Sequence, residues 1–280
     1  MPLPVMFLVL LGAALHATWN AIVKAGSDTL LDTVLVACGA AGIAALALPF
    51  VPLPDNACWP YLGTSVAIHV AYFNLVALAY RTGDLSFAYP IMRGAAPPLT
   101  ALVAAVTVRE PLSTGAWLGI ASISAGILAL TGDSYRAGRL PFAPAGFGLL
   151  NAVVIAAYTL VDGVGVRLAG VAWSYILWNF VLVPLPLLGL ILLTRPQAFA
   201  THLRARWKAG CLGGMCTTVS YSVALWAMTL APIALVAALR ETSVIFGTIF
   251  ASLFLKERFG LVRYLAAGAV TAGALAIRLL

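Results

Sequence analysis

Residues 86–108 read SFAYPIMRGAAPPLTALVAAVTV, and Arg93 is the only charged side chain in this run. A transmembrane helix needs about 20 mostly apolar residues, so the run is long enough to cross a bilayer. Pro90, Pro97 and Pro98 interrupt it. Each proline lacks a donor and leaves a carbonyl about one turn earlier without its partner, which suits a helix that bends beside a water-filled cavity. The run therefore predicts a bent membrane span.

The rest of the chain has the same apolar character. It has 280 residues, of which 62% are hydrophobic and 9% charged, and its mean hydropathy is +1.03. A soluble domain carries roughly a quarter charged residues, so this composition excludes an ordinary water-exposed surface. The apolar runs are continuous instead of alternating, which excludes a membrane β-barrel. We predict an all-α integral membrane protein with ten transmembrane helices at residues 4–23, 33–52, 60–80, 86–108, 113–131, 145–165, 172–193, 208–229, 234–255 and 262–279.

The two halves of the sequence match each other at an offset of 147 positions. Arg93 falls on Arg240, and Glu110 falls on Glu257. Five spans per half is an odd number, so the two halves would cross the membrane in opposite directions as an inverted repeat around a central cavity. The expected division is a first repeat at 1–131, a connecting loop at 132–144 and a second repeat at 145–280.

Similar motifs follow the fourth and ninth predicted spans. The first is Arg109-Glu110-Pro111-Leu112, and the second is Lys256-Glu257-Arg258. With ten short helices in two halves, this pattern resembles the EamA-type transporters of the drug/metabolite transporter superfamily, which include YddG-like amino-acid exporters. The resemblance implies a basket-shaped bundle whose central cavity is lined by the third, fourth, eighth and ninth helices. It implies a carrier and leaves its substrate open.

Positive charge is concentrated in alternate loops. The net charge is +7, and the odd-numbered loops hold eleven of the 16 Lys and Arg residues. Among these loops is the polar stretch 195–208, which includes His202. The positive-inside rule makes the odd loops cytoplasmic and both chain ends external, whereas ten-helix relatives imply cytoplasmic ends. We follow the charge bias and expect a multi-pass protein of the inner (plasma) membrane, whose basic residues meet lipid headgroups and no nucleic acid.

Arg93 is the first candidate for substrate binding. A charged side chain near the bilayer centre costs at least a few kcal/mol, so it needs a partner or a watery cavity. Tyr89, Arg93, Ala96 and Thr100 share one helix face. In one interpretation, the Arg93 guanidinium binds a substrate carboxylate. In the other, Arg93 is a structural arginine that pairs with a neighbouring group.

Arg240 and Glu241 occupy the matching place in the ninth predicted span. Adjacent helical residues diverge by roughly 100°, so we expect one of the two to face the cavity while the other pairs with a second helix. Glu241 is a candidate carrier of a coupling proton. The alternative is a fixed network of Arg93, Arg240 and Glu241 that locks the bundle.

Polar and aromatic side chains at helical spacing mark faces of four further spans. Such faces are consistent with cavity walls, and hydrogen bonds between packed helices are the alternative. The candidate substrate-binding set therefore contains Tyr89, Arg93, Arg240, Glu241, His16, Trp19, Asn20, His69, Tyr72, Tyr158, Tyr221 and Trp226.

These features favour a secondary transporter of small metabolites such as amino acids, with export expected from the family. The rivals are an integral-membrane lipid-processing enzyme and a channel. The chain has no GxSxG or HExxH motif, only three histidines, and four cysteines without a CxxC pair. We therefore expect no enzyme activity, no metal and no cofactor, and the expected partners are a small-molecule substrate and the lipid bilayer.

Overall fold

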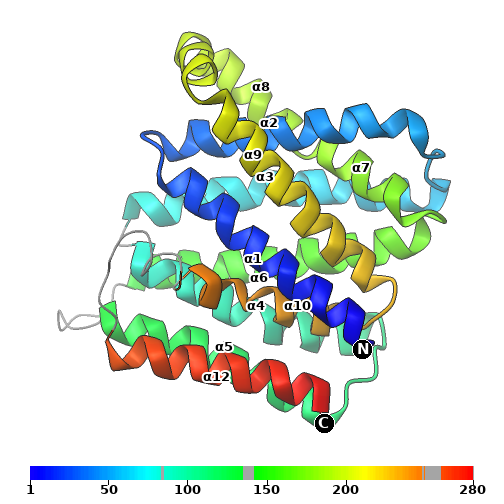
Figure 1. Cartoon of the computed structure of the whole chain (residues 1–280), viewed down its shortest axis with the longest axis vertical. Helices are drawn as coiled ribbons and strands as arrows, with labels where there is room; N and C mark the ends of the chain where they lie inside the picture. The colour runs from blue at the N-terminus through cyan, green and yellow to red at the C-terminus, as the bar shows by residue number, and fades with distance from the viewer. Residues whose placement is uncertain (83–84, 135–141, 248, 250–259, 280) are drawn as a thin grey trace.

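A computed structural model describes residues 1–82, 85–134, 142–247, 249 and 260–279, and its regular elements there are all helices (Figure 1). The first half coincides with the first five predicted spans to about one helical turn. It contains α1 (Leu3–Lys24), α2 (Thr29–Ala47) with a short 3₁₀ turn at Leu48–Phe50, a second such turn at Asn56–Cys58, α3 (Trp59–Thr82), α4 (Leu85–Thr107) and α5 (Thr114–Ser134).

The second half departs from the predicted spans in three places. It contains α6 (Phe142–Leu168), α7 (Ala172–Leu182), α8 (Leu185–Thr194), α9 (Pro196–Met228), α10 (Ile233–Arg240) and α12 (Leu261–Leu279). The predicted span 172–193 is divided into α7 and α8 at Pro184, which cannot donate a backbone hydrogen bond. The predicted span 234–255 is interrupted after Arg240, and α9 begins earlier than predicted.

The expectation that 195–208 is a loop, with His202 in it, is wrong. Residue 196 begins α9, so His202 lies within a helix, and the only irregularity in α9 is a kink at Arg206 (φ −127°, ψ 17°). Proline is well suited to the first position of a helix because that position needs no donor. The charged side chains of residues 195–208 had suggested a loop. The structure accommodates them in a helix, because those that point inward have partners on neighbouring helices.

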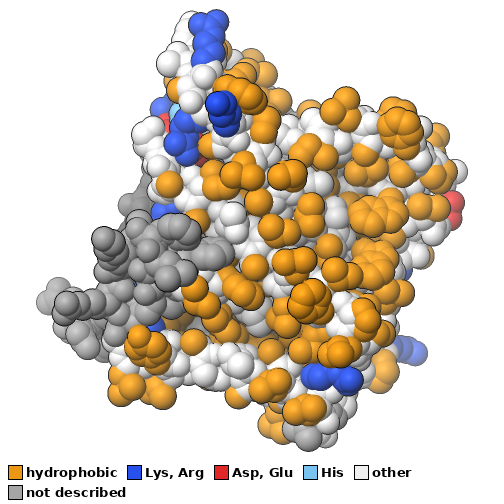
Figure 2. Space-filling view, in the orientation of Figure 1, with side chains coloured by type: hydrophobic (Ala, Val, Ile, Leu, Met, Phe, Trp, Pro, Cys, Tyr) orange, Lys and Arg blue, Asp and Glu red, His pale blue; other side chains and the backbone are white. Residues whose placement is uncertain are grey.

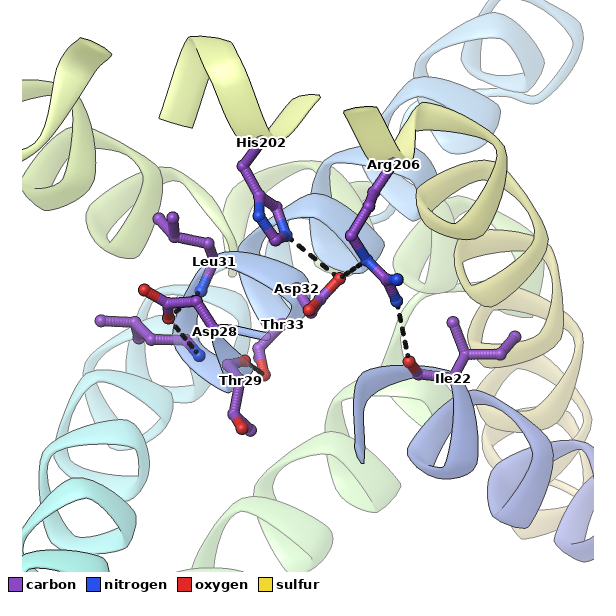
Figure 3. Close-up of polar contacts among 9 residues, drawn as sticks. Ile22, Asp28, Thr29, Leu31, Asp32, Thr33, His202 and Arg206 are labelled. Atoms are coloured by element: carbon purple, nitrogen blue, oxygen red, sulfur yellow. Dashed lines mark hydrogen bonds and ion pairs between the residues drawn. The ribbon is translucent and has the colours of Figure 1, made fainter. Parts of the chain in front are cut away.

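Those partners surround the buried Asp32 carboxylate near the start of α2 (Figure 3). Arg206 Nε donates a 2.7 Å hydrogen bond to Asp32 Oδ1, and His202 Nε2 lies 3.1 Å from the same oxygen. Arg206 also donates to the backbone carbonyl of Ile22 in α1. A Cβ on Gly26 would overlap Asp32 Oδ2, so a larger residue there would displace the carboxylate. This Asp32 cluster (Asp32, His202 and Arg206) fastens the kink of α9 to α1 and α2.

The surface of the molecule is that of a multi-pass membrane protein. Within the described residues, seven helices are long and apolar enough to cross a bilayer. Hydrophobic side chains spread over the face shown in Figure 2. The exposed apolar residues of the chain include Phe7, Val106 and Leu193, which are 67%, 78% and 86% exposed. The all-helical membrane fold is confirmed for this part of the chain. The count of ten spans, their arrangement as an inverted repeat and the domain boundaries stay predictions.

The helices pack in pairs that cross between the two halves. Both α1 and α2 lie along α9, while α3 and α4 lie along α6. At one edge α5 packs against α12, where Gly119 meets Gly273 and Gly126 meets Ala266. Because residue numbers rise along α5 as they fall along α12, these two helices are antiparallel. Figure 1 also places the two chain ends at the same end of the bundle.

Candidate substrate-binding site

The buried charges of α4 and α10 meet between these two helices. Arg93 Nε lies 2.8 Å from Glu241 Oε2, and both side chains are 6% exposed. Pro90, Pro97 and Pro98 lie within α4 around Arg93. Their missing donors release backbone carbonyls near the charged side chain.

Glu241 occupies its position because α10 stops one residue before it. Glu241 and Thr242 form a turn with backbone hydrogen bonds to Ala238 and Leu239, three residues back, and helical structure resumes at residue 243. The Thr242 hydroxyl also donates to the Leu239 carbonyl at 2.6 Å. Such interrupted helices are typical of transporter binding sites, where irregular backbone borders a cavity.

The lining of the cavity corrects the expectation for Arg240 and Glu241. The sequence placed only one of the two toward the cavity, since neighbours on a regular helix point about 100° apart. In the structure both line the same small cavity, and Glu241 also pairs with Arg93. Ala237, Arg240 and Glu241 are spaced i, i+3 and i+4, so both charged neighbours lie on the helical stripe that borders the cavity.

Arg93 is fixed by a second group from α1. Its guanidinium lies 3.2 Å from His16 Nε2, and the Trp19 indole N–H lies 3.2 Å from His16 Nδ1. Tyr89 presents its ring 6.0 Å from the Arg93 Cζ atom. Arg93 is thus held by groups of α1, α4 and α10, which favours a structural role over free access to a substrate.

Arg240 has a different environment, although it is only 9% exposed. Its Cζ atom lies 4.9 Å from the centre of the Tyr221 ring. Among the described residues, no carboxylate oxygen lies within 4.0 Å of its guanidinium, and its buried Nε makes no hydrogen bond. A buried cation without an anionic partner is costly, so Arg240 is the group of this site that most needs an anion.

Asp162 of α6 supplies a negative charge behind Tyr221. Its carboxylate is fully buried and accepts hydrogen bonds from the hydroxyls of Tyr221 at 2.5 Å and Tyr175 at 2.8 Å. The Asn179 amide adds a third hydrogen bond at 3.2 Å and also donates to Ser65. The Tyr221 side chain therefore lies between Asp162 and Arg240, with its hydroxyl on the carboxylate and its ring facing the guanidinium.

An aromatic group forms the α3 side of the site. The His69 and Tyr158 rings lie 4.5 Å apart, and Tyr72 meets Tyr158 edge to face at 5.9 Å. His69 Nδ1 is 2.8 Å from the Ser65 carbonyl, which ties the imidazole to its own helix. Of these three rings, Tyr158 borders the cavity.

The cavity itself lies between α4, α6 and α10. Its interior is about 10 Å³, hardly room for one water molecule and far below the 300–1,000 Å³ of ordinary ligand pockets. The structure therefore shows this site in a closed form. The residues lining the cavity are Arg93, Ala96, Pro97, Thr100, Ile155, Tyr158, Thr159, Ala237, Arg240 and Glu241.

The twelve predicted site residues fall into three groups. Arg93, Tyr158, Arg240 and Glu241 line the cavity. The second group contacts a lining residue directly and contains Tyr89, His16, Tyr221, His69 and Tyr72. The third lies further out: Trp19 contacts His16, Asn20 donates to the His16 carbonyl of its own helix, and Trp226 packs on the large apolar core.

The candidate set left out Asp162, Tyr175 and Asn179, although Asp162 has the same helical spacing to Tyr158 that marked the other candidates. Tyr175 and Asn179 follow each other at one turn on α7 and could have been recognised by that spacing. Their meeting with Asp162 depends on how α6 and α7 pack, which one sequence does not reveal. The described residues hold no group of three His, Cys, Asp or Glu side chains that could bind a metal ion.

Comparison with known proteins finds a family match in the second half of the chain. Residues 144–279 match the model of the EamA-like transporter family. This EamA-like region contains α9, α10 and α12 and nearly all of α6, including Asp162, Tyr221, Arg240 and Glu241. His16 and Arg93 lie before it. The match supports a membrane transporter of the drug/metabolite type.

The fold of the whole chain also has a solved counterpart. A crystal structure titled only as that of a protein superimposes with a TM-score of 0.75, at 16% sequence identity, over 97% of this chain and 94% of that one. At this identity the likeness establishes a shared fold and says nothing of the substrate. No curated protein matches the chain. The EamA-like helices thus form one half of a fold that extends over almost all of the 280 residues.

Proposed function

We propose that this protein is a secondary transporter that carries small metabolites bearing a carboxylate, such as amino acids, across the membrane by alternating access. Export is the direction that the family resemblance favours. The observation that carries the proposal is Arg240, a buried cation that borders the cavity without a carboxylate partner among the described residues. A substrate carboxylate would complete its coordination through the planar guanidinium fork.

Arg240 replaces Arg93 as the proposed anchor for the substrate. Arg93 already faces Glu241 and His16, so a substrate anion would have to displace one of them. Arg240 faces the Tyr221 ring, which leaves the edges of the guanidinium available.

Glu241 gives the site a complementary group. Its Oε2 is 2.8 Å from Arg93 Nε, but the two atoms do not meet the angular requirement of a hydrogen bond, and Oε2 has no other hydrogen-bond partner in the described residues. An acceptor beside an unpaired cation suits a zwitterion, with its carboxylate on Arg240 and its ammonium near Glu241. This pairing is why we place amino acids before simple anions.

The packing of α5 against α12 supports alternation of two inverted halves. With an offset of 147, Gly119 corresponds to Ala266 and Gly126 to Gly273. The observed contacts join Gly119 to Gly273 and Gly126 to Ala266, so each contact is the repeat-related copy of the other. Reciprocal contacts of this kind arise when two equivalent surfaces meet across a two-fold axis. We propose that this axis relates the two repeats.

The test is counterflow in proteoliposomes loaded with a panel of unlabelled amino acids and supplied with the labelled forms. A carrier gives saturable exchange for at least one of them, and Arg240→Lys should lower it at least about tenfold, because lysine cannot present a two-pronged donor. Arg204→Lys, an exposed position on α9, is the matched control and should exchange normally. Flux that never saturates would indicate a channel, and a chemically altered substrate would indicate an enzyme.

A further inference from the structure

A second set of polar contacts joins the same three helices that line the cavity. Glu110 follows the end of α4, Arg167 lies in the last turn of α6, and Ile233 begins α10. An Arg167 guanidinium nitrogen lies 2.7 Å from Glu110 Oε1, and the Ile233 backbone N–H donates to that oxygen at 3.0 Å. We call these three groups the Glu110 clasp.

Arg167 extends the clasp to a fourth helix. Its Nε donates to the Met228 carbonyl at 2.7 Å, and its terminal nitrogen donates to the Ala231 carbonyl at 2.9 Å. Met228 ends α9, where a helix leaves acceptors without partners, and Ala231 lies in the short linker to α10. The Glu110 carboxylate likewise accepts from the first residue of α10, where a helix leaves donors free and favours negative charge.

The clasp lies between the cavity and one face of the molecule. Along α6, Arg167 is eight residues beyond the cavity residue Thr159, or about 12 Å at 1.5 Å per residue. Along α10, Ile233 is four residues, or about 6 Å, before the cavity residue Ala237. Between these levels a Cβ on Gly163 would lie 2.6 Å from the Ile233 side chain, so the helices are in close contact there. A solute reaching the cavity from this face must separate them.

Two local features make the closed clasp easier to release. Arg109 has a φ of 57°, a left-handed conformation that non-glycine residues seldom adopt. Glu110 Oε2 is buried, and it has no hydrogen-bond partner within the described part of the chain. Opening would let Arg109 relax and would expose the unpaired oxygen to water, which offsets part of the lost ion pair.

We propose that the Glu110 clasp is the gate of the transport cavity on this face, so that Glu110 parts from Arg167 and from Ile233 whenever the cavity opens there. The proposal rests on the transporter function proposed above. It adds a role for the Arg109-Glu110-Pro111 motif: the strained Arg109 turns the chain so that Glu110 reaches α6 and α10. The Asp32 cluster, at the other end of α9, belongs to the firmly packed group of α1, α2 and α9 and is not part of this gate.

The test measures access to the cavity without any substrate. In the full chain with its four cysteines replaced, Thr159→Cys places one thiol in the cavity wall, and a membrane-impermeant maleimide is applied to proteoliposomes. Asn56→Cys, exposed before α3, reports the same face, since the neighbouring Asp55 bonds to the Ala169 carbonyl just after α6. We expect Glu110→Gln to raise the labelling rate of residue 159 from this face at least about tenfold, which corresponds to a 1.4 kcal/mol shift toward the open form.

Asp32→Asn is the matched control, because it removes a buried carboxylate charge at the opposite end of α9 and should leave this labelling unchanged. Should Glu110→Gln not fold, as judged by thermal melting in detergent, Arg167→Lys provides the second variant. Lysine retains the charge but cannot reach Glu110 and both carbonyls together, so labelling should again rise.

The gate would be overturned if residue 159 were labelled at an unchanged rate in the folded variants while Asn56→Cys stayed reactive. It would also be overturned if Asp32→Asn raised the labelling rate of residue 159 as much as Glu110→Gln does. Because the assay contains no substrate, its result is independent of the proposed function. Increased labelling in a protein that exchanges no metabolite would leave the gate standing and remove the proposed function. Exchange with unchanged labelling would remove the gate alone.

Discussion

The Ser122 hydroxyl of α5 donates a 2.8 Å hydrogen bond to the backbone carbonyl of Ala269 in α12, the residue 147 positions later in the chain. Because this separation equals the offset of the predicted internal repeat, Ser122 bonds to the residue predicted as its repeat equivalent. A residue can meet its equivalent only close to the axis that relates the two copies. The bond therefore locates the proposed two-fold axis between α5 and α12, with the reciprocal glycine contacts on either side of it.

The first prediction concerns these glycine contacts. A Cβ on Gly273 would lie 2.6 Å from the Gly119 carbonyl oxygen and 2.7 Å from the Ile123 side chain, so Gly273→Ala should force α5 and α12 apart. We expect the mutation to lower stability by about 1–3 kcal/mol. Gly268→Ala is the control on the same helix, since a Cβ there meets nothing within 4 Å. Thermal melting in detergent compares the two, and equal melting temperatures would contradict the close contact.

The second prediction concerns the pair of Arg93 and Glu241. Arg93→Ala should destabilise the protein by about 3–5 kcal/mol, because it leaves a buried carboxylate without compensation. Removing both charges in Arg93→Ala with Glu241→Ala should be less harmful than the single change, since no unpaired charge remains. The measurement is a double-mutant cycle of unfolding in detergent. Additive effects would mean that the two groups do not form an energetic pair.

The third prediction concerns orientation. Asn56 and Thr201 are exposed residues on opposite sides of the proposed bilayer, before α3 and early in α9. The charge bias of the loops predicts that Asn56→Cys is labelled from outside the cell and Thr201→Cys from inside. Labelling of both from the same side would refute the span arrangement. Labelling on opposite sides with the reverse sense would refute the charge rule alone. Ser134, a further candidate reporter of the cytoplasmic face, has a side chain outside the described residues.

The sequence predicts most helices well because burial in lipid requires long apolar runs, which are visible without knowledge of packing. It fails where polar contacts decide the outcome. α9 extends back to Pro196 because Asp32 and the end of α1 receive its charged side chains, and those partners are distant in sequence. Gly268 and Gly273 of α12 cannot be distinguished by the sequence either, but in the described structure Gly273 packs on α5 whereas Gly268 meets nothing within 4 Å.

The candidate site shows the same division. The repeat and the rarity of intramembrane charge pointed to Arg93, Arg240 and Glu241, and the structure brings all three to one cavity. Which arginine is paired could not be predicted, because that depends on the turn after α10 and on His16 from α1. The hydrogen-bond partners of Asp162 could not be predicted either, since its three donors come from α7 and α9. Their roles in binding a substrate stay predictions.

The fourth prediction tests the Asp32 cluster through Gly26. A Cβ at this position would overlap Asp32 Oδ2, so Gly26→Ala should displace the carboxylate from Arg206 and His202 and lower stability by about 1–3 kcal/mol. Gly42→Ala, on α2 with open space around it, is the control. In an Asp32→Ala background the Gly26→Ala change should lose most of its effect, because the overlapping atom is gone. Thermal melting measures both changes. If Gly26→Ala lowered stability as much in the Asp32→Ala background as in the original protein, its effect would not come from overlap with the Asp32 carboxylate.

The last prediction separates the two functions of Tyr221. Its ring faces Arg240 at 4.9 Å, and its hydroxyl donates to Asp162 at 2.5 Å. Tyr221→Phe keeps the ring but leaves an oxygen of a buried carboxylate without a donor, so we expect a loss of about 1–3 kcal/mol in stability with little change in apparent substrate affinity.

Tyr221→Leu removes the ring as well. Arg240 then loses the aromatic side chain that lies between it and Asp162, and we expect the two charges to pair, which would remove the cation from the cavity. Exchange assays should therefore show a raised half-saturation concentration in Tyr221→Leu only, and the additional change Asp162→Asn should restore part of the affinity by removing the competing anion. Equal half-saturation in the phenylalanine and leucine variants would show that the ring does not position Arg240, and the substrate anchor would then have to be sought at Arg93.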